Sequence, residues 1–202
     1  MKSKILRLLA GGLLVGSMGA IAAPVQWAGN GHYYEYIPSV TTWTNAHYAA
    51  LAGTFNGMHG YLATVTSKAE NDFLYSFISG STRPAGGWLG GTDAAVEGTW
   101  VWADGPEAGV NFWNGQAGGS SPTYANWDGS PWSEPGGGTE NYVTLTTRTG
   151  GGWNNLEVDG TYYLTGLFVE YATAAVSVPG PGTLALLGIS LAGLAMSRRR
   201  KQ

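Results

Sequence analysis

Two glutamates and two neighbouring asparagines carry side-chain oxygens that are suited to holding a cation. Glu134 and Glu140 lie at either end of a glycine-rich segment, and Asn154 and Asn155 are adjacent further along the chain. Hard cations such as Ca²⁺ prefer carboxylate and amide oxygens, and calcium tolerates the irregular geometry of a loop. If the fold brings the two segments together, these four residues form a candidate calcium site.

The local sequence indicates how the two segments meet. Two prolines and four glycines between residues 127 and 138 exclude a helix or a central strand there, which places Glu134 on a loop. Residues 142–146 are β-branched and aromatic, as is typical of a strand, so Glu140 lies where that strand begins. The glycines at 150–152 then predict a turn and a returning strand that carries both asparagines. One end of this hairpin would therefore gather the four side chains.

The N-terminal half predicts two helices and two short strands. Thr42 is suited to cap the first helix, whose apolar residues recur at helical spacing. Ser67 and Glu70 form a capping box at the start of the second helix, in which each side chain satisfies the other residue's backbone N–H. Strands are predicted at 31–37 and 61–65.

The C-terminal half predicts further strands and a long loop. Strands are expected at 86–93 and 98–105, and the last strand, within 162–171, is expected to pair with the first. Residues 105 to 138 show no clear secondary-structure pattern. Loops of that length are uncommon in compact domains and usually serve a function.

The tryptophans fall into two groups. Those that alternate along predicted strands are expected in the core: Trp88, Trp100, Trp102 and Trp153. Those in the long loop are expected either to present a face for stacking on a sugar or to pack beneath the loop: Trp113, Trp127 and Trp132. Trp127 and Trp132 are therefore candidate glycan contacts.

Both ends of the chain differ from the middle. Basic residues followed by an apolar run and a small-residue cleavage site predict a secretory signal peptide over 1–22. A proline-glycine motif, a short apolar run and an arginine cluster fill 177–202, which predicts a membrane segment. This order resembles the PEP-CTERM sorting signal of bacterial envelope proteins, which implies processing by a sorting protease. The expected localisation is export to the cell envelope or beyond, with a C-terminal membrane segment before processing, and 23–176 is the expected domain.

The charge of the predicted domain excludes some partners. Of the ten basic residues only Lys68, Arg83 and Arg148 lie in 23–176, with all thirteen acids, so its formal charge is −10. Such a domain repels nucleic acid and anionic lipid but is compatible with divalent cations. The chain has no cysteine, so packing, and a bound metal if present, must stabilise it.

The order of motifs resembles the C-type lectin-like domain over most of residues 31–171. Three segments carry the resemblance: Trp88-Leu89-Gly90-Gly91, Glu134-Pro135-Gly136 with Glu140 after it, and Trp153-Asn154-Asn155. The resemblance implies an α+β, C-type lectin-like fold, with two helices packed on small antiparallel sheets and a long irregular loop region. It also implies carbohydrate binding, in which a calcium ion bridges the protein and vicinal sugar hydroxyls.

Carried over by position, the family's cation ligands fall on Glu134, Glu140, Asn154 and Asn155, and its sugar contacts on Glu134, Glu140 and Asn154. Two positions depart from the family pattern. Gly136 lacks the amide oxygen of the family's asparagine, and Asn155 replaces an aspartate, so the charge on the cation's ligands is lower. Asp159 is a possible substitute carboxylate.

These features favour an exported, non-enzymatic module that binds a glycan or exopolysaccharide. The chain lacks a cysteine nucleophile, a Gly-x-Ser-x-Gly elbow, a His-Glu-x-x-His motif and a phosphate loop. A glycosidase with Glu134 and Glu140 as its two carboxylates is a weaker reading, because both fall on the cation-ligand pattern. The alternative function is a lectin-like fold with a degenerate cation site that binds other surface proteins or builds a matrix.

Overall fold

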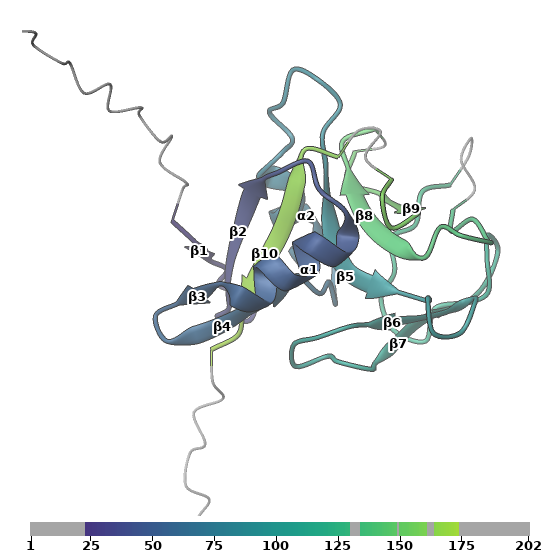
Figure 1. Ribbon diagram of the computed structural model, residues 1–202, viewed down its shortest axis with the longest axis horizontal. Helices are drawn as coiled ribbons and strands as arrows, with labels where there is room; N and C mark the ends of the chain where they lie inside the picture. Colours follow the sequence, from purple (N-terminus) through teal and green to yellow (C-terminus); the bar gives the residue numbers. More distant parts are fainter. Residues whose placement is uncertain (1–22, 130–133, 149, 161–163, 174–202) are drawn as a thin grey trace, which may run out of the picture.

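The computed structural model describes residues 23–129, 134–148, 150–160 and 164–173, in which a branched, mixed sheet is flanked by two helices (Figure 1). The helices are α1 (Trp43–Ala52) and α2 (Lys68–Ser76). The strands in these residues are β1 (Val25–Gln26), β2 (Tyr33–Pro38), β3 (Thr54–Phe55), β4 (Met58–Leu62), β5 (Gly86–Thr92), β6 (Thr99–Trp102), β7 (Asn111–Asn114), β8 (Tyr142–Thr146), β9 (Trp153–Leu156) and β10 (Gly166–Tyr171). The predicted α+β class is confirmed.

Strand β10 joins the two ends of the described chain. It runs antiparallel to β2 from Gly166 opposite Pro38 to Tyr171 opposite Tyr33, as predicted for the last and first strands. It also pairs with β4 in antiparallel and with β5 in parallel. The expectation of antiparallel sheets was therefore incomplete, because the β5–β10 contact makes the sheet mixed. Parallel neighbours need a long connection, and their pairing leaves no local mark in the sequence.

Strand β5 connects the two halves of the sheet and anchors the hairpin that carries the candidate site. It pairs with β6 at Gly91 and Thr92, and with β8 at residues 86–88 and at Thr92. Strand β8 pairs in turn with β9. Close packing requires glycine at two places in β5. A Cβ on Gly87 would lie 2.6 Å from the ring of Phe168, and a Cβ on Gly91 would lie 2.5 Å from Val143.

Both helices begin at the predicted caps. The Thr42 hydroxyl accepts a hydrogen bond from the backbone N–H of Asn45 at 3.2 Å, and the Ser67 hydroxyl accepts one from that of Glu70 at 3.2 Å. The second half of the predicted capping box is wrong. The Glu70 carboxylate accepts from the backbone N–H of Thr66, at 2.7 Å, because it is buried and turned toward the sheet.

The strand tryptophans form the core as predicted. Trp88, Trp100 and Trp153 are fully buried and Trp102 is nearly so. Trp102 stacks on Phe112, with ring centroids 4.3 Å apart, and meets Trp153 edge-on. Aromatic burial on this scale supplies much of the hydrophobic stabilisation that the disulfide-free chain requires.

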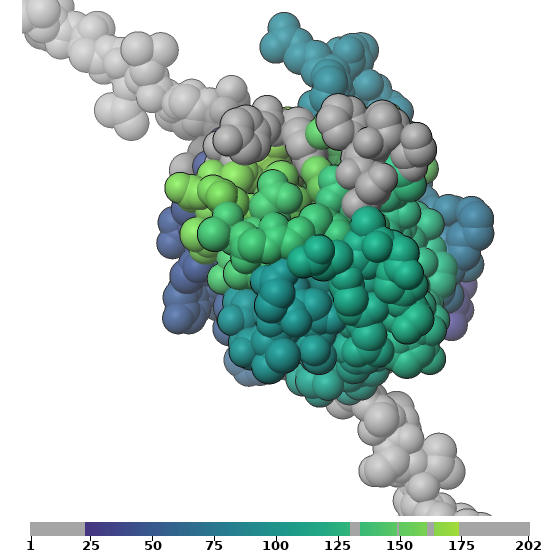
Figure 2. All heavy atoms as spheres, turned by 90° about the vertical axis from the view of Figure 1, so that its right-hand side faces the viewer, coloured from purple at the N-terminus to yellow at the C-terminus, as the bar shows by residue number. Residues whose placement is uncertain are grey.

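Among the described residues of the segment predicted to lack structure, one strand forms. Within 105–138, β7 pairs with β6, and Asn114 forms an isolated bridge with Ser120. Segments from β6 onward make up most of the face shown in Figure 2. Strand β7 was missed because it has only four residues, Asn111–Asn114, and two of these are asparagines.

The predicted localisation, with a C-terminal membrane segment, is wrong on the structural finding: none of the helices in the described part of the chain is long and apolar enough to cross a membrane. The predicted signal peptide (1–22) and sorting signal lie outside the described residues.

Candidate functional site

The loop that carries Glu134 lies against β9, and Asn155 connects the two. Asn155 is fully buried and faces Val143 across the β8–β9 pair. Its side-chain Oδ1 accepts a hydrogen bond from the backbone N–H of Gly136 at 2.9 Å. Its Nδ2 donates to the carbonyl oxygen of Gly136 at 3.0 Å and to that of Glu140. The two segments that sequence analysis expected to meet are in direct contact.

Three side-chain oxygens converge on the space beside Gly136. A Cβ placed on this glycine would lie 3.1 Å from Oε2 of Glu140, 3.7 Å from Oε2 of Glu134 and 3.9 Å from Oδ1 of Asn155. Two of the oxygens come from the loop that precedes β8, residues 134–140, and the third comes from β9. Two carboxylates and an amide oxygen are a donor set that fits a hard cation.

Burial and nearby negative charges raise the pKa of both carboxyl groups. Partial burial raises the pKa of Glu134 to about 7, opposed by the hydrogen bond from the Gly136 N–H and reinforced by the negative charges of Glu140 and Asp128. Burial also raises the pKa of Glu140, with a further contribution from Glu157. Neighbouring carboxylates that repel each other are stabilised by a cation placed between them.

The loop is also held from its outer side. The backbone N–H of Gly138 donates to Oε1 of Glu97 at 3.1 Å, and that of Ala117 donates to the Pro135 carbonyl at 2.9 Å. A Cβ on Gly137 would lie 2.0 Å from Nε2 of Gln116, so a larger residue there would displace the end of the Gln116 side chain. Sequence analysis did not identify Glu97 or Gln116. The glycine run was the only local signal, because it allows other chain segments to approach closely.

Asn154 is on the same strand, with 9% of its surface exposed. Its backbone carbonyl accepts a hydrogen bond from the Thr144 hydroxyl at 3.2 Å. The hydrogen bonds to Gly136 are made by the side chain of Asn155. The role of Asn154 as a ligand stays a prediction. Within the described residues, no group of three or more histidine, cysteine, aspartate or glutamate side chains could hold a metal. Any cation here would depend on two carboxylates and amide oxygens.

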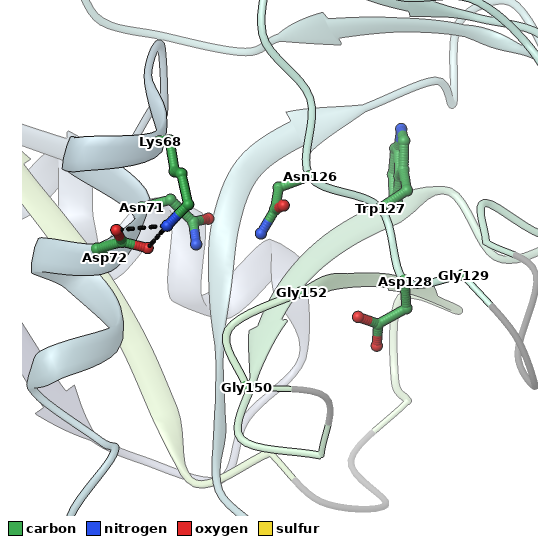
Figure 3. A pocket seen from close by; sticks show the side chains of 9 residues that line it. All are labelled: Lys68, Asn71, Asp72, Asn126, Trp127, Asp128, Gly129, Gly150 and Gly152. Carbon is green, nitrogen blue, oxygen red and sulfur yellow. Dashed lines mark hydrogen bonds and ion pairs between the residues drawn. The ribbon is translucent and has the colours of Figure 1, made fainter.

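Two clefts flank this loop. One, of about 310 Å³, is lined by residues on either side of Glu140 and by Glu157, Val158 and Asp159. Asp159, the possible substitute carboxylate, therefore borders the cleft beside Glu140. The other, of about 410 Å³, lies between α2, residues 126–129 and the turn after β8 (Figure 3). The carbonyl oxygen of Asp128 in this second cleft accepts the backbone N–H of Glu134 at 2.9 Å.

Trp127 lines the second cleft, but its ring points away from the other side chains there (Figure 3). The ring lies 4.8 Å from that of Trp100, centroid to centroid, and 5.8 Å from that of Trp153. These contacts favour packing beneath the loop, one of the two alternatives that the sequence left open. A glycan contact by Trp127 stays a prediction, and Trp132 lies outside the described residues.

A second pair of glutamates, one on α2 and one on β10, is buried. Glu70 and Glu170 are each 1% exposed, and the Tyr34 hydroxyl contacts both, at 2.5 and 3.0 Å. Glu170 also accepts from the Thr64 backbone N–H at 3.0 Å and lies 2.6 Å from Nδ1 of His32. These contacts assign Glu170 a role in the fold. The network was not predicted, because its members are far apart in sequence.

A mixed sheet, two helices and a long loop region whose carboxylates meet a hairpin asparagine define a C-type lectin fold. The sequence matches the Lectin C-type domain family over residues 42–163, more than half of the chain. The chain therefore belongs to this family. Membership of a lectin family supports the prediction that the chain is not an enzyme.

Known relatives agree with this assignment. Halomucin from Haloquadratum walsbyi is 36% identical to this chain over 144 residues. The match covers 70% of this chain and 1% of halomucin. A lectin from Pleurodeles waltl is 32% identical over 63% of this chain and 64% of its own length. The solved structure of CEL-I, a C-type lectin from Cucumaria echinata, has a TM-score of 0.53 at 21% identity over 71% of this chain and 91% of CEL-I, which shows a shared fold. The chain spans less than two thirds of the length of these two curated relatives.

Proposed function

We propose that this domain binds a neutral glycan through a calcium ion held by Glu134, Glu140, Asn154 and Asn155. The observation that carries the proposal is the convergence of side-chain oxygens from the loop and from β9 on the space beside Gly136. A lone acidic loop would not bring an amide oxygen of a buried strand to the same point. Membership of a lectin family supports the glycan as the ligand.

Each residue has a distinct part in this proposal. The two carboxylates supply the negative charge that holds the cation, and the asparagines supply neutral oxygens. Calcium, when bound, offers coordination positions to two neighbouring hydroxyls of a sugar. Glu134 and Glu140 can accept hydrogen bonds from those hydroxyls, and the Asn154 amide can donate one. Because Gly136 has no side chain, the space between the carboxylates stays open to the ligand.

The charge of the chain favours neutral glycans. The predicted domain has thirteen acidic and three basic residues, so polysaccharides rich in uronate or sulfate are repelled. A glycan array with and without calcium should therefore show binding to neutral sugars that chelator abolishes. Binding restricted to anionic glycans would contradict this choice of ligand.

Removal of the Glu140 carboxylate tests the cation site. Calcium at one hundred times its dissociation constant should stabilise the purified protein by roughly 2.7 kcal/mol, and chelator should reverse this. Glu140→Ala should remove the calcium effect in a thermal melt and in calorimetry while the protein stays folded. Glu157→Ala, which removes an exposed carboxylate nearby, is the matched control and should keep most of the effect. A wild-type melting curve that ignores both calcium and chelator would contradict the proposal.

A second candidate function rests on Gly136 and Asn155. The first contributes no side-chain oxygen and the second no charge, and both lower the expected affinity for calcium. In this alternative the same surface binds another protein or builds a matrix. This alternative would be supported if calcium changed neither the melting curve nor the glycan-array signals.

A further inference from the structure

We propose that the side-chain amide of Asn155 holds loop 134–140 in its binding shape without a cation, so that cation binding completes a site that is already formed. Asn155 is thus a positioning residue for the site. This inference concerns how the proposed site is regulated, but it does not depend on calcium being bound.

The hydrogen bonds of Asn155 use nearly everything that an amide offers. The Nδ2 group donates to the carbonyls of Gly136 and Glu140, and Oδ1 accepts from the Gly136 N–H. Both backbone polar groups of Gly136 are therefore paired with the Asn155 side chain, as they would be with a neighbouring antiparallel strand, and the Gly136 N–H is shared with Oε2 of Glu134 at 3.0 Å. Because Asn155 is fully buried, water does not compete for these bonds.

An aspartate at this position could not do the same. A carboxylate has nearly the shape of the amide but only accepts hydrogen bonds. Its oxygens would face the carbonyl oxygens of Gly136 and Glu140, which would lose their donors. It would also add a negative charge beside Glu134 and Glu140. Such a loop needs a cation to hold it, whereas the amide holds the loop by itself.

Other contacts support the loop in the same cation-independent way. Its start is held by the backbone N–H of Glu134, which donates to the Asp128 carbonyl at 2.9 Å. Its middle is held by the Ala117 N–H on the Pro135 carbonyl at 2.9 Å. The Gly138 N–H is bound by Oε1 of Glu97 at 3.1 Å. Asn155 is the contact that ties this loop to the core strand β9.

Hydrogen–deuterium exchange of the purified wild-type protein in chelator tests the inference directly. The Gly136 amide should be protected in chelator, and calcium should slow its exchange only slightly further. Exchange of this amide that is fast in chelator and slowed strongly only by calcium would overturn the inference. This measurement needs no variant and therefore stands even if a substitution prevents folding.

Asn155→Asp provides the sharper test. In chelator its Gly136 amide should exchange roughly tenfold faster than in wild type or more, because buried carbonyls lose their donors. Calcium should restore protection in the variant, a rescue that a merely structural defect would not show. Asn141→Asp adds the same charge near Glu140 without touching the amide contacts, and it should leave Gly136 protected. An Asn155→Asp loop as protected in chelator as the wild-type loop would overturn the inference.

The two proposals fail in distinguishable ways. If wild-type protein shows no heat of calcium binding but keeps Gly136 protected in chelator, the calcium proposal fails and the role of Asn155 stands. If calcium binds and is required for protection, the calcium proposal stands and the role of Asn155 fails.

Discussion

Two pairs of glutamates in this protein differ in how many hydrogen-bond donors reach them. Around Glu70 and Glu170, both oxygens of each carboxylate accept at least one hydrogen bond from protein, and each residue is only 1% exposed. Around Glu134 and Glu140, the amide donors of Asn155 go to backbone carbonyls instead. Oε2 of Glu134 accepts the Gly136 N–H at 3.0 Å, and Oε2 of Glu140 lies 3.1 Å from the position that a Cβ on Gly136 would take.

This difference indicates which acids build the fold and which can bind. Carboxylates saturated by protein donors are fixed, and a cation would have to displace those donors. Carboxylates that few protein donors reach keep lone pairs for a ligand. Side-chain type does not separate the two pairs, since all four residues are glutamates. The two pairs differ in their neighbours. The fold brings tyrosine, threonine and histidine donors to Glu70 and Glu170, and a glycine to Glu134 and Glu140.

The largest expected effect of a single substitution is at the buried pair. Glu170→Ala leaves the Tyr34 hydroxyl, the Thr64 N–H and His32 without their buried acceptor. Breaking such a network costs about 3–5 kcal/mol of unfolding free energy, measurable by urea denaturation. Glu140→Ala, measured without calcium, is the comparison and should cost less than about 1 kcal/mol. Equal losses at the two glutamates would contradict the distinction between the pairs.

Much of the fold was predictable because its signals are local. The two tryptophans at alternate positions of β6 mark its buried face, and the glycines after β8 mark the turn that returns Asn155 to the loop. Those patterns reflect periodicity and turn chemistry, which act between near neighbours. They were sufficient to bring together Glu134, Glu140 and Asn155.

What the sequence could not supply depends on distant partners. The capping-box pattern placed the Glu70 carboxylate on its own helix end, but burial turned it to Tyr34, thirty-six residues earlier. The parallel contact of β5 with β10 is likewise set by the whole fold. The amide of Asn155 was expected to serve a cation, and its bonds to two carbonyls depend on a loop conformation that no spacing rule describes.

A smaller effect, on calcium affinity, is expected from adding a side chain at Gly136. Gly136→Asn adds an amide oxygen among the carboxylates and should raise calcium affinity about tenfold by adding a ligand. The new Cβ would lie 3.1 Å from Oε2 of Glu140, so that flexible side chain must shift by a few tenths of an ångström. Gly136→Ala adds the Cβ without the oxygen and separates the two effects. Calorimetry that shows equal affinity for both variants would contradict the assignment of this space to a cation.

The smallest expected effect is a pH dependence that calcium removes from one pair only. Burial raises the pKa of Glu134 to about 7 and raises that of Glu70, while the hydrogen bond to Glu170 raises the pKa of His32. Each folded-state pKa lies above its unfolded value. In chelator, the unfolding free energy should therefore fall between about pH 5 and pH 8, because the folded state holds protons that the unfolded state has released.

Calcium should flatten only part of this slope. Calcium ligation requires an ionised Glu134, so the ion stabilises the protein more at the alkaline end of the range and cancels the contribution of Glu134. The groups around Glu134 are Glu140, Asp128 and Arg148, and those around His32 are Glu170, Glu107 and Glu70. In chelator, Glu134→Gln should reduce the pH dependence of the unfolding free energy as much as calcium does in wild type. The pH dependence that is left, from Glu70 and His32, should be the same with or without calcium. Urea denaturation at three pH values measures both, and a slope that calcium abolishes completely would assign the buried pair to the cation as well.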